Sequence, residues 1–110
     1  MRDNRKEDNE QNDESALSQR IDKWLWCARF FKTRGLAAKF VSSRSLRLNR
    51  HGSKLRVSKP GFLVRPGDRL TYGRSGHVIS IKIMACAERR GPASEASRLY
   101  ENITTTEAND

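Results

Sequence analysis

The apolar spacing of this chain changes from a helical to an extended pattern near residue 45, and this change constrains the fold most. From Arg20 to Phe31 apolar residues recur three and four positions apart, and the spacing continues from Thr33 to about Ser43. After residue 45, apolar and polar residues alternate at 46–49 and 79–84, as in half-buried strands. We therefore expect two helices followed by several short strands.

Turn residues divide the second half of the chain into short strands. We expect strands at 62–64, 70–72 and 79–83, with turns at Pro60-Gly61, Pro66-Gly67-Asp68 and Ser75-Gly76. Pro92 suits the first position of a short helix that runs through Tyr100. The chain has room for one small domain, which we place at residues 18–101, with disordered tails at 1–17 and 102–110.

Basic charge is concentrated in the centre of the chain. Residues 20–90 hold 18 of the 22 Lys and Arg residues but only three of the 13 Asp and Glu residues, so both flanking segments are acidic. A field of this sign attracts nucleic acid or an anionic membrane surface. Because no apolar run approaches the roughly 20 residues that span a bilayer, and residues 1–19 lack a signal-peptide core, we expect a cytoplasmic protein without membrane contact.

Between Arg20 and Arg50, nine basic residues accompany a single acid, Asp22. Surfaces that serve solubility alone usually mix both signs, so this imbalance favours phosphate binding. Lys32-Thr33-Arg34 adds a hydroxyl and a helix N-terminus, which both meet nucleic-acid phosphates, although Thr33 can also simply cap the helix. The candidate nucleic-acid contacts are Arg20, Lys23, Arg29, Lys32, Thr33, Arg34, Arg44, Arg47, Asn49 and Arg50.

The first helix has aromatic residues on two sides. We place Trp24 in the core, whereas Trp26 and Phe30 lie on the other side of the helix. These two side chains can stack on unpaired bases or anchor a protein partner. We favour packing beneath the C-terminal helix, which offers Leu99 and Tyr100 as a cover.

The sequence offers little material for catalysis. Cys27 and Cys86 have no Cys or His neighbour at metal-binding spacing, so we expect buried free thiols. His51 and His77 lie in turn-like segments, and Asp68 is better explained as a turn former. With no phosphate loop, nucleophile elbow or carboxylate pair, we expect no catalytic residue, no metal and no cofactor.

Several of these segments together resemble the RNA-binding domain named after ribosomal protein S4. The resemblance rests on Arg20-Ile21-Asp22-Lys23, Lys32-Thr33-Arg34 before Ala37, the strand ending at Asn49, and Lys59-Pro60 with Pro66-Gly67-Asp68. More narrowly, Asp22-Lys23-Trp24-Leu25-Trp26, Ala28-Arg29-Phe30 and residues 89–96 resemble the bacterial heat-shock protein 15 group. The family usually has Gly near Arg44, at the bend after the second helix, and Gly where this chain has Arg50.

The resemblance implies an α+β fold of the S4-like (alpha-L) type, in which two N-terminal helices pack on a small, mostly antiparallel sheet, followed by a short C-terminal helix. It also implies a non-enzymatic protein that binds structured RNA, above all rRNA of the large ribosomal subunit, in a heat-shock and ribosome-recycling role. Two alternatives stay open, a protein-docking module that uses the aromatic residues and a general RNA- or DNA-binding accessory protein. We expect a monomer.

Overall fold

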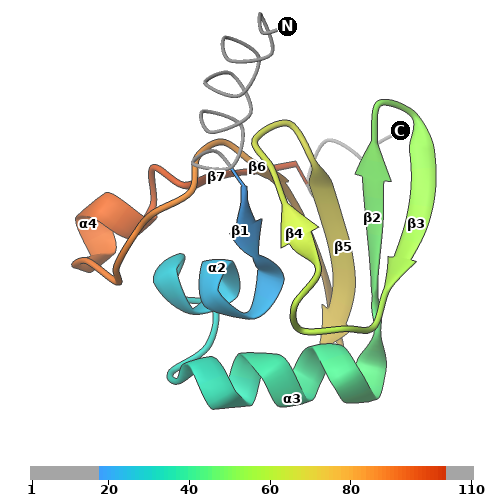
Figure 1. The fold of residues 1–110 in the computed structure, drawn as a ribbon, viewed down its shortest axis with the longest axis horizontal. Coiled ribbons are helices and arrows are strands. Elements are labelled where there is room, and N and C mark those ends of the chain that lie inside the picture. Colours follow the sequence, from blue (N-terminus) through green and yellow to red (C-terminus); the bar gives the residue numbers. More distant parts are fainter. Residues whose placement is uncertain (1–17, 104–110) are drawn as a thin grey trace, which may run out of the picture.

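The described part of the chain, residues 18–103 of a computed structural model, contains a five-stranded sheet, a small two-stranded sheet and three helices (Figure 1). The elements are β1 (Gln19–Arg20), α2 (Ile21–Cys27), α3 (Arg34–Arg44), β2 (Leu46–Arg50), β3 (Ser53–Val57), β4 (Leu63–Val64), β5 (Arg69–Arg74), β6 (His77–Ile83), α4 (Ala93–Ala96) and β7 (Tyr100–Asn102). The larger sheet has the order β3-β2-β5-β6-β7, and every neighbouring pair is antiparallel. The expected α+β architecture is confirmed.

The core lies between helices α2 and α3 and one face of the larger sheet (Figure 1). Trp24 and Leu25 of α2 and Val41 of α3 are fully buried. Leu48 and Leu70 face them from the sheet, with at most 1% of their surface exposed. Burial of these large apolar side chains is the main source of stability for so small a domain.

Helix α2 ends at Cys27, four residues earlier than the spacing predicts. The chain turns there because Arg29 adopts a left-handed conformation with φ of 67°. Ala28 and Phe31 still reach the core, with 2% and 4% exposed surface. Their helical spacing therefore reflected burial on one side of the chain rather than a continuous helix.

Helix α3 begins as expected, because the Thr33 hydroxyl accepts a hydrogen bond from the Leu36 amide at 3.0 Å. Ala37 and Val41 are buried, and Phe40 is partly buried. The expectation that Leu36 faces inward is wrong, since 49% of its surface is exposed. Ala37 and Val41, four positions apart, form the buried side of α3. Leu36 lies in the first turn, at the edge of this buried side.

The strands expected at 46–49, 62–64, 70–72 and 79–83 are present as β2, β4, β5 and β6, and three further strands were not predicted. One is β3, which forms a hairpin with β2 through a two-residue turn at His51 and Gly52. Both turn residues have positive φ, of 52° and 86°, as a type I′ hairpin turn requires. The expected turn at Ser75-Gly76 has the same form and joins β5 to β6.

The C-terminal part differs most from expectation. The predicted helix through Tyr100 is only the four-residue α4, and Pro92 is its N-cap rather than its first helical residue. Tyr100 begins strand β7, which pairs with β6, and the Ile103 amide donates to the Ser80 carbonyl. The expected tail therefore starts too early at 102; its remainder, 104–110, and the predicted tail at 1–17 lie outside the described residues.

The segment at 85–91, which follows β6, is bonded to β1 and α2. The Trp24 indole Nε1 donates to the Ala85 carbonyl at 2.8 Å, and the Gln19 side chain exchanges hydrogen bonds with the backbone of Ala87. Arg90 Nε donates to the Trp26 carbonyl at 2.9 Å. These bonds join groups more than 60 residues apart and hold α2 in place. Among the described helices, none is long and apolar enough to cross a bilayer.

Candidate nucleic-acid interface

A buried carboxylate organises the basic residues at the start of α2. Asp22 is only 3% exposed and accepts two hydrogen bonds from Arg20, from Nε at 3.1 Å and Nη2 at 3.0 Å. Arg34 Nε, from the first residue of α3, lies 3.6 Å from Asp22 Oδ2. The Lys23 amide donates to Asp22 Oδ1 at 2.7 Å. One carboxylate thus ties together β1, α2 and α3.

Opposing effects act on the pKa of Asp22. Burial pushes the pKa upward, and the hydrogen bonds from Arg20, the charges of Arg34 and Arg20 and the Lys23 amide outweigh it, so the pKa falls below its usual value. The same hydrogen bonds raise the pKa of Arg20. Asp22 is therefore ionised at neutral pH, and about half of the Arg20 side-chain surface still faces solvent.

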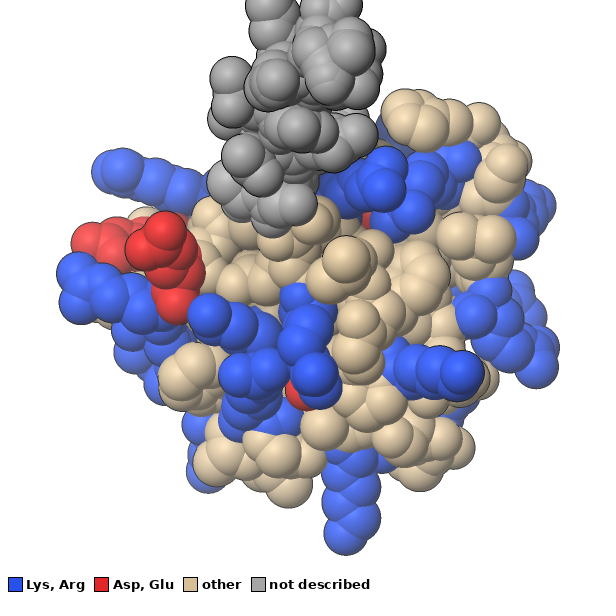
Figure 2. All heavy atoms as spheres, in the orientation of Figure 1, with Lys and Arg blue, Asp and Glu red and all other residues tan. Residues whose placement is uncertain are grey.

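Arg20, Lys23 and Arg34 border a shared hollow of about 550 Å³. Its other lining residues are Ser18, Gln19, Leu63, Cys86, Ala87 and Glu88. Figure 2 shows the side of the molecule on which β1 and α2 lie nearest the viewer, with basic side chains spread across it and most of the visible acidic atoms gathered at the left edge. We call Arg20, Lys23 and Arg34, with Lys32 and Thr33 just before α3, the helix surface.

Lys32, Thr33 and Arg44 are exposed, but they lie at different ends of α3. Lys32 and Thr33 precede the helix, close in sequence to Arg34. Arg44 is its last residue, with its guanidinium 5.8 Å from the Phe40 ring centre. At 1.5 Å per residue, about 15 Å of helix separates Arg34 from Arg44, so Arg44 is not part of the helix surface.

Arg29 and Arg50 have partners within the fold. Arg29 Nε donates to the Gly91 carbonyl at 2.9 Å. Arg50 forms a two-point pair with Asp68, at 2.9 and 2.8 Å, that raises the pKa of the guanidinium. Asp68 also accepts the Arg65 amide at 2.9 Å, which confirms it as a turn former. With 22% of its side chain exposed, Arg50 holds the β2 end of the sheet to this turn.

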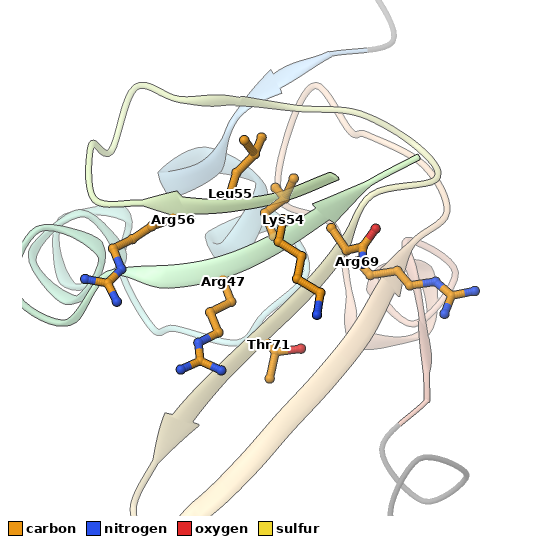
Figure 3. Close-up of a pocket in the computed structure, with 8 residues that line it drawn as sticks. Arg47, Lys54, Leu55, Arg56, Arg69 and Thr71 are labelled. Atoms are coloured by element: carbon orange, nitrogen blue, oxygen red, sulfur yellow. The ribbon is translucent and has the colours of Figure 1, made fainter. Parts of the chain in front are cut away.

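Arg47 and Asn49 lie on a different face of the molecule from the helix surface. Side chains alternate along β2, so Leu46 and Leu48 enter the core while Arg47 and Asn49 point to the outer face of the sheet. In Figure 3, α2 and α3 lie behind the sheet that carries Arg47. The ten predicted contacts therefore do not form one surface.

The aromatic side chains of α2 and of the turn after it pack within the protein, as the sequence analysis favoured. Trp24 is fully buried, as expected. The Phe30 ring lies 4.7 Å from that of Tyr100, centre to centre, although Tyr100 belongs to β7 rather than to a helix. Trp26 is partly buried, with the Arg90 guanidinium 5.8 Å from its ring. Neither Trp26 nor Phe30 stands free as an anchor.

Neither cysteine forms a disulfide; Cys27 is buried and Cys86 is half-buried. Burial raises the pKa of Cys27 and raises that of Cys86 to about 11, which keeps both thiols protonated at neutral pH. Within residues 18–103, no group of three His, Cys, Asp or Glu side chains could hold a metal ion.

The sequence analysis missed Lys54, Arg56 and Arg69, which line a hollow on the outer face of the sheet with Arg47 and Asn49. The signal was available for β3. In residues 53–57, Lys54 and Arg56 alternate with Leu55 and Val57 after the His51-Gly52 turn.

Comparison with known proteins places these features in a family. Residues 19–70 match the S4 domain. Heat shock protein 15 of Escherichia coli K12 is 40% identical over 86 residues, which cover 78% of this chain and 61% of that protein. The heat shock protein 15 homolog of Haemophilus influenzae is 39% identical over 87 residues, 79% of this chain and 63% of that one. The chain thus spans about three-fifths of the length of these curated relatives.

A solved structure also resembles this chain. The trimeric structure of Vibrio cholerae heat shock protein 15 is similar with a TM-score of 0.67 and 35% sequence identity, over 84% of this chain and 92% of that one. The expectation of a monomer gains no support from a trimeric relative.

Proposed function

The chain belongs to the heat shock protein 15 family of S4-domain proteins, and from this membership we propose that it binds structured RNA without catalysing a reaction. Proteins of this family are in general RNA-binding and non-catalytic. We further propose that the RNA is rRNA of the large ribosomal subunit and that the protein acts in the cytoplasm, in a heat-shock and ribosome-recycling role.

The arrangement around Asp22 carries the proposal. A buried carboxylate positions Arg20 and Arg34 at the rim of one hollow, beside Lys23, and 51% and 43% of the surface of these two side chains stays exposed. Cations held in place lose little conformational entropy on meeting a phosphate. Folded RNA is recognised largely by its shape and its phosphate backbone, which such a fixed cationic rim suits.

We assign the direct contacts to the helix surface. Arg20, Lys23, Lys32 and Arg34 supply the charges, and Thr33 fixes the N-terminal end of α3 beside them. Arg44 extends the contact toward the other end of α3. Arg29 and Arg50 serve the fold first and add positive charge nearby.

The other two candidate functions lack a supporting observation of this kind. A protein-docking module needs an exposed aromatic anchor, whereas Trp26 and Phe30 pack against Arg90 and Tyr100. Duplex DNA has the phosphate charge of RNA but not its shape. Binding measurements with RNA and with duplex DNA therefore distinguish an RNA-binding protein from a general nucleic-acid-binding protein.

The test is an affinity measurement with a large-subunit rRNA fragment across several salt concentrations. We expect Lys23→Gln to weaken binding and to reduce the slope of log affinity against log salt by roughly 0.7 to 0.9, the share of one phosphate contact. Arg98→Gln removes an exposed charge far along the chain and is the matched control. A Lys23→Gln protein that binds like wild type contradicts the assignment.

Selectivity for the large subunit needs its own experiment. We expect the protein to sediment with isolated large subunits, and duplex DNA of equal charge to be a poor competitor. Equal displacement by every polyanion would reduce the proposal to general RNA binding.

A further inference from the structure

The outer face of the five-stranded sheet carries a second basic surface. Arg47 on β2, Lys54 and Arg56 on β3 and Arg69 on β5 project from this face, with the helices behind the sheet (Figure 3). They line a hollow of about 460 Å³ together with Leu48, Asn49, Leu55 and Thr71, and this lining contains no acid. We call Arg47, Asn49, Lys54, Arg56 and Arg69 the sheet surface.

The strand register fixes the spacing of these charges. Arg47 is directly opposite Arg56, and Asn49 lies between Lys54 on one side and Arg69 on the other. Neighbouring strands are about 4.8 Å apart and alternate residues along a strand about 7 Å. The positions that carry the cations therefore form a regular grid with spacings of about 5 to 10 Å. This range includes the distance between successive phosphates of one nucleic-acid strand.

The sheet surface continues toward the β2–β3 turn. A neighbouring hollow of about 320 Å³ is lined by Asn49, His51, Gly52, Gly67, Arg69 and Lys82. Lys82 is directly opposite Arg69 in the register. Basic side chains thus extend over four adjacent strands, a width of about 14 Å.

These charges have no evident role in the fold. Like charges directly opposite each other destabilise an antiparallel pair, as Arg47 and Arg56 do here. Within residues 18–103, Arg47, Lys54, Arg56 and Arg69 make no ion pair or side-chain hydrogen bond. Arg50, on the opposite side of the same strand as Arg47, is paired with Asp68. The fold neutralises its inner cation and leaves the outer ones available.

Most of the sheet surface lies on the opposite side of the sheet from the helix surface, but the two surfaces approach each other at one edge, where Arg56 and Arg20 line the same hollow of about 540 Å³. The buried layer that includes Trp24, Leu48 and Leu70 lies between them. An RNA helix that lies across Arg47 and Arg69 leaves Lys23 and Arg34, on the other side of this layer, for a second RNA segment.

We propose that the sheet surface binds the phosphate backbone of a second RNA segment, so that one protomer bridges two RNA helices. The bridging role rests on the proposed RNA binding by the helix surface, whereas the affinity of the sheet surface for RNA does not. The contacts are to phosphates, because the grid offers cations and one amide without aromatic side chains for base stacking.

The test counts RNA molecules per protomer by native mass spectrometry, with a short RNA hairpin and the full chain. The sheet variant is Lys54→Gln, Arg56→Gln and Arg69→Gln; the helix variant is Lys23→Gln with Arg34→Gln. We expect two hairpins on wild type, one on each variant and none on the combination. The sheet variant should also reduce the salt slope of its own site by roughly 2 to 3, at 0.7 to 0.9 per contact. Circular dichroism and thermal unfolding verify that each variant is folded, and Arg98→Gln is the control.

The outcomes separate the two proposals. One hairpin on wild type, retained by the sheet variant and lost by the helix variant, overturns the second site and leaves the proposed function intact. One hairpin lost by the sheet variant and retained by the helix variant overturns the helix surface and the bridging. In a second assay, wild type should capture a labelled hairpin on an immobilised one, and the sheet variant should not; capture by the sheet variant contradicts bridging.

Discussion

The residue scale is represented best by Asp22, where one side chain serves both the fold and the candidate interface. Its carboxylate is buried, yet it holds two arginines whose side chains remain about half exposed. A lone acid within a basic segment is visible in the sequence. Its burial and its pairing with Arg34 depend on how α2 meets α3, which residue spacing alone does not reveal.

Replacing Asp22 by Asn should destabilise the protein in a pH-dependent way. The pKa of Asp22 is lowered on folding, so its ionised form adds stability above its unfolded pKa of about 3.9, and this stability is lost as the pH falls through the lower folded value. We expect a loss of about 2 kcal/mol at neutral pH, the scale of charged hydrogen bonds. Urea unfolding at neutral pH and near pH 3 measures the difference between variant and wild type, which should shrink in acid.

Glu101→Gln is a suitable control because Glu101 is exposed and does not line the hollow beside Arg20, Lys23 and Arg34. A deficit for Asp22→Asn that stays the same in acid would exclude the charged pairs as its cause.

The sequence predicted the contacts of single residues correctly where the contacting residue is near in sequence. Thr33 caps α3 through an amide three residues away, and this contact was predicted. Arg50 was expected to meet phosphate, but the structure pairs it with Asp68, 18 residues away. A contact across that distance is set by the sheet register, which the sequence does not display.

At the scale of elements, the alternating pattern identified β2, β5 and β6 because each covers the core with one face. Strand β7 was not predicted because its three residues are too few to show an alternation of apolar and polar residues. Ser45, at the bend after α3, has φ of 55°, where the family usually has Gly nearby. The departure noticed in the sequence thus marks a real bend that this chain makes without glycine.

The edge strand β3 should gain stability when its charge opposite Arg47 is removed. Arg56→Thr relieves a like-charge pair and places a β-branched residue in a strand, so we expect an increase of about 0.5 kcal/mol in the free energy of unfolding. Thermal unfolding at low and high salt measures it, and the salt-dependent part should vanish at high salt.

Arg56→Lys keeps the charge and should leave the stability nearly unchanged. If Arg56→Thr is less stable than wild type at low salt, repulsion between Arg47 and Arg56 is not significant. Arg56→Thr should also weaken RNA binding by the sheet surface, because Arg56 both repels Arg47 and is a proposed phosphate contact.

At the scale of the whole molecule, the family and the architecture followed from the sequence, but the division of the basic residues into two surfaces did not. The net charge of +9 says how many cations there are. Only the alternation along β2, with Leu48 inside and Arg47 outside, assigns them to separate faces. A single predicted set of ten contacts was therefore too coarse.

Free protein should become more stable as salt is added, because mobile ions screen the repulsion among its basic residues. We expect the melting temperature without RNA to rise by roughly 4 to 8 °C between low and high salt, which corresponds to about 1 kcal/mol. RNA affinity should fall over the same range. Differential scanning calorimetry with and without RNA measures both trends, and a melting temperature that falls with salt would contradict net self-repulsion.

The bonds between α2 and the segment at 85–91 also set an order of events during synthesis. Ala85 and Ala87 supply the carbonyls that receive the Trp24 and Gln19 side chains. A nascent chain that stops before these residues lacks the groups that fix α2 and, with it, Lys23. The helix surface is therefore completed only after most of the domain has been translated, and a truncated fragment does not present it in finished form.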